Sequence, residues 1–216
     1  MPDSPSPRLL SIEGIDGAGK SSQVAAVAAA LNLVGVRAEP VVVKAYGARS
    51  VNALAERMTG DRFAYHPLIP AELREWVFAC DVAYYTHTEF TPLFDAGATL
   101  VWDRGPLSYR VSAMAYGGLT DWVERVQSLF PQPQFTYLLD LAPDAAVQRL
   151  RQRASKPQQA DESVPLLKQV RELMLDAADG RSDIVLIDAT LPVAEITGRI
   201  VEHWLAQQTA SPPAAR

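Results

Sequence analysis

The stretch Gly14–Ser21, which reads GIDGAGKS, decides the fold class of this chain. Its spacing, G-x-x-x-x-G-K-[ST], is that of a phosphate-binding P-loop, and it lies between an apolar run and an Ala-rich helical stretch, the context that the motif requires. Glycines let the backbone turn tightly so that several N–H groups point inward, and the following helix adds the positive end of its dipole. The stretch therefore predicts a site for the phosphates of a nucleotide.

The side chains of the loop suit a nucleoside triphosphate with its magnesium ion. Lys20 supplies a charge that can follow the β- and γ-phosphates, and the hydroxyl of Ser21 can bind Mg²⁺. We therefore predict ATP and Mg²⁺ as cofactors, with Ser21 as a metal ligand. The loop residues predicted to bind ATP are Gly14, Asp16, Gly17, Ala18, Gly19, Lys20, Ser21 and Ser22. The loop leaves the acceptor open, because ATPases, GTPases and kinases share it.

Around the loop, apolar runs alternate with helical stretches, a pattern that is typical of parallel βαβ units. Strands are predicted over Leu9–Glu13, Ala38–Val43, Thr99–Trp102, Phe135–Leu139 and Ile184–Ile187. Helices are predicted over Lys20–Val34, Val51–Met58, Ala71–Phe90, Asp121–Leu129, Asp144–Arg153, Pro165–Ala178 and Val193–Gln207. This order predicts an α/β protein of the P-loop NTPase fold, with a five-stranded parallel sheet, helices on both faces and a short lid.

Composition indicates one folded domain that handles small molecules. The net charge of −5 disfavours a nucleic acid polymer as partner, and no apolar run is long enough to predict a membrane span. The single cysteine, Cys80, cannot form an intrachain disulfide, so a cytoplasmic location is expected, and its side chain is expected to be buried. We predict a disordered leader at 1–7, one kinase domain at 8–208 and a disordered tail at 209–216.

Five stretches, in order along nearly the whole chain, resemble thymidylate kinases. They are SIEGIDGAGKSSQ at the loop, VFACDVAYY in the helix that holds the thymine base, LVWDRG at a strand end, FTYLLDLAPDAAVQRLRQR leading to the lid, and VLIDATLPVAEI at the last strand. The resemblance implies an enzyme, usually a homodimer, that transfers a phosphoryl group from Mg-ATP to the small-molecule acceptor dTMP, giving dTDP.

The resemblance also implies roles for single residues. Asp16 is expected near the transferred phosphate, and Arg104, beside Asp103, is expected to grip the migrating phosphoryl group at a strand end, where open α/β sheets bind ligands. The implied catalytic residues are Lys20, Asp16, Asp103, Arg104 and Arg153. Arg149, one helical turn before Arg153, is expected to contact ATP. The implied acceptor-binding residues are Tyr46, Arg74, Phe78, Arg104 and Tyr116.

The helix that is expected to hold the acceptor base carries the main departure from the family. Phe78 matches the ring that stacks on thymine, but Val82 stands where the family has the Arg that reads the base, and Val82 cannot donate that hydrogen bond. Arg74 or Arg110 could reach the base edge instead. Helical spacing places Arg74, Phe78, Val82 and Tyr85 near one face, and the predicted core stripe is the other set: Leu73, Trp76, Val77, Cys80 and Tyr84.

Three other segments depart from the family pattern. VKAYGARSV replaces the usual Arg-Glu-Pro segment after the second strand. Gly105 replaces the Tyr of the family's Asp-Arg-Tyr. The Ser-x-x-Ala-Tyr pattern that follows in the family matches Ser112 to Tyr116 only if this chain has an insertion. Ser108 matches the serine without an insertion, but the Ala-Tyr does not follow it. The lid lacks Gly-x-x-Asp-Arg, and its remaining basic residues are Arg149, Arg151, Arg153 and Lys156.

These departures leave ATP handling intact and alter acceptor recognition. The leading hypothesis is therefore a thymidylate kinase that works by direct in-line transfer without a covalent enzyme intermediate. A kinase of the same type for another nucleotide, a nucleoside or a small metabolite is the first alternative. A catalytically idle nucleotide-binding module that acts as a dimer is the second.

Overall fold

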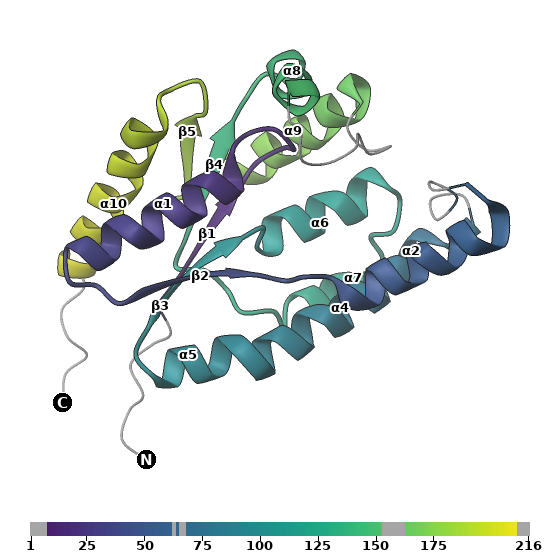
Figure 1. Ribbon diagram of the computed structural model, residues 1–216, viewed down its shortest axis with the longest axis horizontal. Helices are drawn as coiled ribbons and strands as arrows, with labels where there is room; N and C mark the ends of the chain where they lie inside the picture. Colours follow the sequence, from purple (N-terminus) through teal and green to yellow (C-terminus); the bar gives the residue numbers. More distant parts are fainter. Residues whose placement is uncertain (1–7, 62–63, 65–67, 153–162, 211–216) are drawn as a thin grey trace.

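The fold is a doubly wound α/β sheet, seen in a computed structural model that describes residues 8–61, 64, 68–152 and 163–210 (Figure 1). The predicted leader, the region of Arg153 and Lys156, and residues 211–216 lie outside the described residues. Among the described residues, no helix is both long and apolar enough to cross a membrane.

Five parallel strands form one sheet in the order β2-β3-β1-β4-β5. Their bounds are Leu9–Glu13 (β1), Ala38–Val42 (β2), Thr99–Asp103 (β3), Phe135–Asp140 (β4) and Ile184–Asp188 (β5). The interior strands β1 and β3 are buried at every position, whereas the edge strands β2 and β5 alternate between buried and open positions. Pro40 is tolerated in β2 because an edge strand needs only one row of hydrogen bonds. The predicted five-stranded parallel sheet is confirmed.

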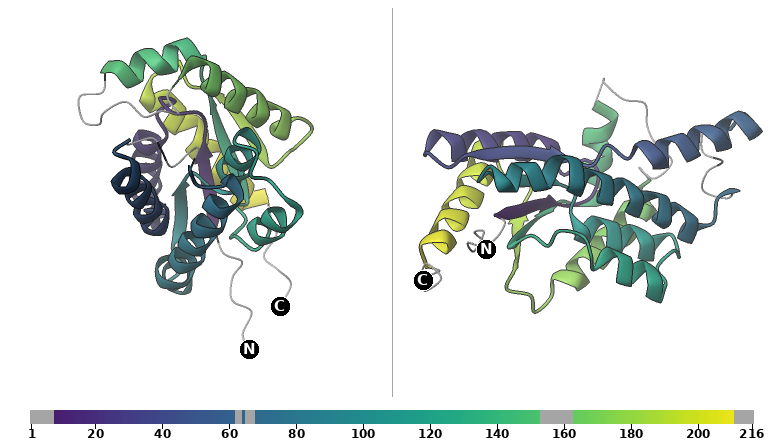
Figure 2. Two further views of the ribbon diagram at one scale, coloured as in Figure 1. Left: turned by 90° about the vertical axis from the view of Figure 1, so that its right-hand side faces the viewer. Right: turned by 90° about the horizontal axis from the view of Figure 1, so that it is seen from below.

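Helices cover both faces of this sheet (Figure 2). Helices α1 (Lys20–Leu33) and α10 (Val193–Ala210) pack together on one face. On the other face, α4 (Ala71–Tyr85), α6 (Pro106–Ala115), α7 (Asp121–Gln127) and α9 (Val164–Ala178) form a contiguous layer. The remaining helical segments are α2 (Tyr46–Thr59), a π-helical turn η1 (Thr86–Phe90), α5 (Thr91–Asp95) and α8 (Pro143–Gln152).

Helix α6 was not predicted from the sequence, although it leads directly out of the strand end that carries Arg104. Pro106 at its first position, where a backbone N–H is not needed, was the available signal. Helix α2 also begins a turn earlier than predicted. The backbone N–H groups of Gly47 and Ala48 donate to the two carboxylate oxygens of Asp81, at 2.9 and 3.1 Å, so a residue of α4 caps the start of α2.

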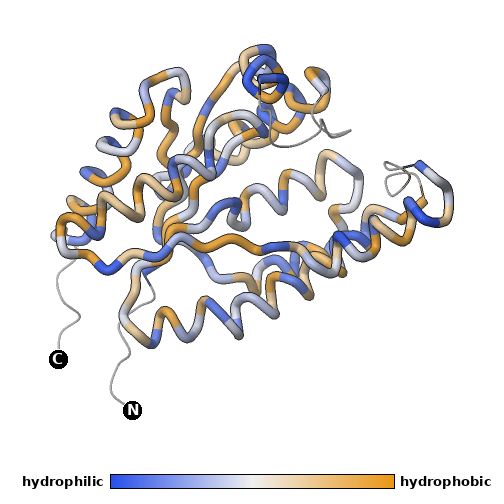
Figure 3. The backbone as a smooth tube through the Cα atoms, viewed as in Figure 1, coloured by the Kyte–Doolittle hydropathy of each residue, from blue (hydrophilic) through white to orange (hydrophobic). Residues whose placement is uncertain are grey.

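The predicted core stripe of α4 was wrong. Val82 and Tyr85 are completely buried, in a cluster around Trp102, whereas Leu73, Trp76 and Tyr84 are about half exposed and Cys80 is exposed. Helical spacing gives α4 two apolar sides, and only the position of the sheet decides which one is covered. Helix α2 and the first half of α4 extend beyond the sheet, and both contain hydrophobic residues along this part (Figure 3). The side chains of Leu54, Met58, Leu73 and Trp76 there are exposed.

Candidate active site

The P-loop begins where β1 ends, in the middle of the sheet, and is clamped between β4 and α8. A side chain on Gly14 would place its Cβ 2.6 Å from the carbonyl oxygen of Leu139, and one on Gly17 would lie 2.6 Å from that of Ala146. Both glycines also have positive φ angles, of 139° and 86°. Larger residues are therefore excluded by contact as well as by backbone conformation.

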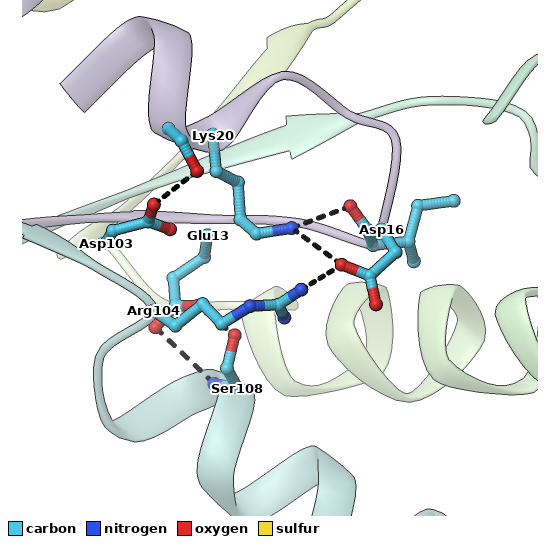
Figure 4. Close-up of polar contacts among 8 residues, drawn as sticks. Glu13, Asp16, Lys20, Asp103, Arg104 and Ser108 are labelled. Carbon is cyan, nitrogen blue, oxygen red and sulfur yellow. Dashed lines mark hydrogen bonds and ion pairs between the residues drawn. The ribbon is translucent and has the colours of Figure 1, made fainter. Parts of the chain in front are cut away.

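Lys20 is folded back over its own loop (Figure 4). Its Nζ donates to the carbonyl oxygen of Ile15 at 2.8 Å and lies 3.7 Å from Oδ1 of Asp16, and the side chain is only 6% exposed. The pKa of Lys20 is lowered to about 8, chiefly by burial and also by the nearby Arg104, while the carboxylate of Asp16 acts in the opposite direction. A desolvated ammonium group that donates to a carbonyl can exchange that carbonyl for a phosphate oxygen.

Arg104, the residue after β3, crosses to the same place from the neighbouring strand. It has a left-handed φ of 65°, which is uncommon for a residue with a side chain, and its guanidinium forms an ion pair with Asp16. Burial lowers the pKa of Arg104, but Asp16 and two further carboxylates more than offset this, so the pKa is raised. Asp16 thus holds both cations, Lys20 and Arg104, within one small cluster (Figure 4).

Ser21 and Asp103 form a second pair beside the cluster. The hydroxyl of Ser21 donates to Oδ2 of the nearly buried Asp103 at 2.6 Å. A P-loop hydroxyl and a strand-end carboxylate are the oxygen ligands that P-loop NTPases present to Mg²⁺. Among the described residues, no group of three His, Cys, Asp or Glu could hold a metal ion. The pair fits a Mg²⁺ ion that takes its other ligands from phosphate and water, and it adds Asp103 to the predicted metal ligand Ser21.

Glu13 and Ser108 lie directly beneath the cations and were not predicted as site residues. Glu13 is completely buried, and both the hydroxyl and the backbone N–H of Ser108 donate to its carboxylate. Burial raises the pKa of Glu13 to about 7, against the effects of Ser108, Arg104 and Lys20. The sequence feature that could have identified Glu13 as a site residue is a charged side chain at the last position of an otherwise mainly apolar strand. This contact also favours Ser108, which needs no insertion, over Ser112 as the serine that matches the family's Ser-x-x-Ala-Tyr pattern.

Gly105 explains one departure from the family pattern. A Cβ on Gly105 would lie 2.9 Å from the Cβ of Ser11 and 3.2 Å from Oε1 of Glu13. Real Cβ atoms do not approach other carbons this closely, so a larger residue would push α6 away from β1. The glycine thus allows α6 to come close enough for Ser108 to reach Glu13.

The residues expected around the acceptor base are not gathered in one place. Arg74 lies 5.1 Å from the ring centroid of Tyr116, which follows the last residue of α6. A helix of ten residues is about 15 Å long, so this pair lies at the opposite end of α6 from Arg104. Tyr46 is exposed at the start of α2, and Arg110 forms an ion pair with Glu124 of α7 at 2.8 Å.

Phe78 is the one predicted base-binding residue that lies near the site, and another ring covers it. Its ring centroid is 4.4 Å from that of Tyr109, a buried residue of α6 that was not predicted to matter. On the ATP side, Arg149 donates to the carbonyl oxygen of Ala189 at 3.0 Å, which ties α8 to the turn after β5. Arg153 lies outside the described residues.

Comparison with known proteins agrees with this arrangement. A sequence model of the thymidylate kinase family matches residues 12–200. The chain belongs to the thymidylate kinase family. The resemblance inferred from the five stretches is therefore confirmed, as are the P-loop NTPase fold and the classification as a nucleotide kinase.

Thymidylate kinases from distant organisms align with nearly the whole chain. A probable thymidylate kinase of Methanoculleus marisnigri is 32% identical over 200 residues, covering 87% of this chain and 89% of that protein. A probable thymidylate kinase of Pyrobaculum calidifontis is 29% identical over 197 residues, covering 89% and 93%. The thymidylate kinase of Dinoroseobacter shibae is 28% identical over 205 residues, covering 91% and 95%.

Proposed function

We propose that this member of the thymidylate kinase family transfers the γ-phosphoryl group of Mg-ATP to dTMP, giving dTDP and ADP. The observation that carries the proposal is the cluster in which Asp16 holds Lys20 and Arg104 together at the carboxyl ends of β1 and β3. Two cations at one strand-end site match the negative charge that spreads over a phosphoryl group during transfer.

The residues of the cluster divide the work between donor and acceptor. Lys20 exchanges the carbonyl of Ile15 for the β- and γ-phosphates when ATP occupies the loop. Arg104 exchanges its contact with Asp16 for the migrating phosphoryl group. Arg149, held at the turn after β5, supports the ATP side, and Arg153 is proposed to act from the lid. Bound Mg²⁺, held by Ser21 and Asp103, would neutralise charge on the phosphates.

The reaction itself needs no general base. The second pKa of a phosphate monoester is about 6, so the acceptor phosphate is already a dianion near pH 7. One of its oxygens attacks the γ-phosphorus while the bond to the bridging oxygen of ADP breaks, and no covalent enzyme intermediate is needed. Positioning and charge stabilisation therefore account for the catalysis.

The test is ADP release measured with ATP, Mg²⁺ and a panel of acceptors: dTMP, dUMP, dCMP, dGMP and thymidine. The expected result is turnover with dTMP that Lys20→Ala reduces at least about 10²-fold, since such electrostatic groups contribute several kcal/mol to the transition state. Lys168→Ala, at an exposed lysine of α9, is the matched control and should be fully active. Turnover with thymidine but with no monophosphate would identify a nucleoside kinase, and no turnover at all would favour the idle module.

We also propose that the chain works as a homodimer in the cytoplasm. Large apolar side chains remain exposed on α2 and α4: Leu54, Met58, Leu73, Trp76 and Tyr84. Several large exposed apolar side chains on two helices that contact each other are typical of a protein–protein interface. Sedimentation velocity of the wild type should give a dimer, and Trp76→Glu should give a monomer. A monomeric wild type at micromolar concentration would refute the proposed assembly.

A further inference from the structure

The side chains between the cation cluster and Phe78 are packed against one another. Tyr109 lies on α6, directly after the Ser108 that bonds to Glu13, and its ring centroid is 4.4 Å from that of Phe78 with the planes at 53°. Flat rings need about 3.5 Å between them, so a base inserted between these two rings would require a separation of about 7 Å. The space is therefore filled by the protein itself.

Tyr109 cannot easily turn out of this space. Its ring also lies 5.8 Å from Trp102 and 5.9 Å from Phe130, and Val82 is completely buried in the same cluster. The backbone around Tyr109 is anchored as well, because Ser108 is bonded to Glu13. Moving the ring would therefore disturb both a packed core and the residue pair beneath the cations.

Tyr109 also lies close to the cation cluster, because Ser108, the residue before it, donates to Glu13, and its ring centroid is 5.8 Å from that of Trp102, the residue before Asp103. Burial above all raises the pKa of Tyr109 well above its ordinary value. Glu13 and Asp103 raise it further, and Arg104 opposes them. The ring is thus close to the residues that meet the acceptor phosphate and touches the ring that is expected to meet the base. A base that stacked on the side of Phe78 facing α6 would need the space that the ring of Tyr109 fills.

From these contacts we infer that Tyr109 determines acceptor specificity by closing to a nucleobase the side of Phe78 on which it packs. The acceptor is then held through its phosphate and sugar, and the base adds little affinity. Val82 offers no hydrogen bond that could compensate, since its side chain is apolar and completely buried. The inference rests on the proposed function, because it concerns the acceptor side of the same site. It predicts a dTMP kinase with weak dTMP binding and poor discrimination between bases.

The experiment compares binding of dTMP with binding of 2-deoxyribose 5-phosphate, which lacks the base, by titration calorimetry on the full chain. The wild type should bind both with similar affinity. Tyr109→Ser, which opens the face of Phe78, should bind dTMP about 10-fold more tightly than the wild type does, within the roughly 5- to 150-fold that base stacking on an aromatic ring provides. Its affinity for 2-deoxyribose 5-phosphate should not change.

Two variants control for the loss of core packing. Tyr109→Phe keeps the ring in place and should bind like the wild type. Phe130→Leu removes another ring that packs on Tyr109 but leaves the ring of Tyr109 on Phe78, so it should lower thermal stability without creating a preference for dTMP. If Tyr109→Ser does not fold, Tyr109→Leu carries the same expectation, because leucine is smaller and apolar.

Two results would overturn the inference. One is a wild type that already binds dTMP about 10-fold more tightly than 2-deoxyribose 5-phosphate. The other is a folded Tyr109→Ser variant without any gain for dTMP. A failure of the proposed function would give another result. The affinities of wild type and Tyr109→Ser for dTMP and 2-deoxyribose 5-phosphate would be as expected, but no acceptor monophosphate would be phosphorylated at saturation.

Discussion

The donor side and the acceptor side of this site are built in opposite ways. On the donor side, polar groups converge and pair with one another, as in the desolvated Lys20, which donates to a carbonyl of its own loop and lies beside Asp16. The acceptor side is instead filled by apolar side chains that pack in one cluster, among them Phe78, Val82 and Tyr109. The comparison suggests that phosphoryl transfer and acceptor choice can change independently within one fold, since the first depends on a loop backbone and the second on a few side chains.

The largest expected effect is that of Arg104→Ala in the cation cluster. Removal of an arginine that meets charge developing in the transition state lowers kcat by about 10³-fold in comparable sites. The dissociation constant for ATP should change far less, because Arg104 comes from β3 and not from the P-loop. Single-turnover kinetics together with ATP titration would measure both quantities. A variant with normal kcat and weak ATP binding would place Arg104 on the donor nucleotide instead.

Val82→Arg tests whether the acceptor side can be restored by one substitution. Val82 is completely buried, so the new guanidinium would be buried without a partner, and we expect a loss of about 3–5 kcal/mol in the free energy of unfolding. Urea denaturation would measure it, with Val82→Ala as a control for lost packing alone. A stable Val82→Arg variant that discriminates sharply for dTMP would show that the pocket is open and would contradict the comparison.

Glu13→Gln tests the buried carboxylate beneath the cations. The pKa of Glu13 is raised from 4.5 to about 7, so between these values the folded state binds the proton more tightly than the unfolded state does. Stability should therefore fall as the pH rises from about 4.5 to 7, by about 3 kcal/mol in total, and this decrease should be absent in Glu13→Gln.

Urea denaturation of both proteins between pH 5 and 7.5 would measure the effect of Glu13. The pKa of Lys20 is lowered from 10.5 to about 8. Between these pH values the unfolded state binds the proton more tightly, so the contribution of Lys20 to the free energy of unfolding rises as the pH rises. The two contributions are therefore separated along the pH axis. A constant difference between wild type and Glu13→Gln over the acidic range would contradict burial of an ionisable Glu13.

The smallest expected effect is that of Asp81→Ala at the start of α2. Asp81 accepts two backbone hydrogen bonds from Gly47 and Ala48, and loss of such a cap costs about 1–2 kcal/mol. Asp121→Ala, at an exposed aspartate that begins α7, is the matched control and should change stability by less than about 0.5 kcal/mol. Urea denaturation would measure both variants. Equal effects of the two substitutions would mean that Asp81 does not hold α2 in place.

Most of the framework and of the donor side could be predicted from local patterns. The strand bounds agree with the predicted ones to within about a residue, because most of the strands are short, mainly apolar runs between turn residues. The contacts of Lys20, Ser21 and Arg104 with nearby carboxylates agree with a P-loop beside a strand-end Asp-Arg pair. The acceptor side was predicted less well, since it depends on which faces of α4 and α6 meet.

The amino-acid sequence by itself determined the sheet, the loop and the family, because these follow from spacing between neighbours in the chain. Only the tertiary structure decided that Val82 rather than Trp76 enters the core, that Ser108 reaches Glu13, and that Tyr109 covers Phe78. Each of these contacts joins residues far apart in the sequence, and a helix with two apolar sides carries no local mark of the side that will be buried. That choice is made by the free energy of packing in the assembled layers.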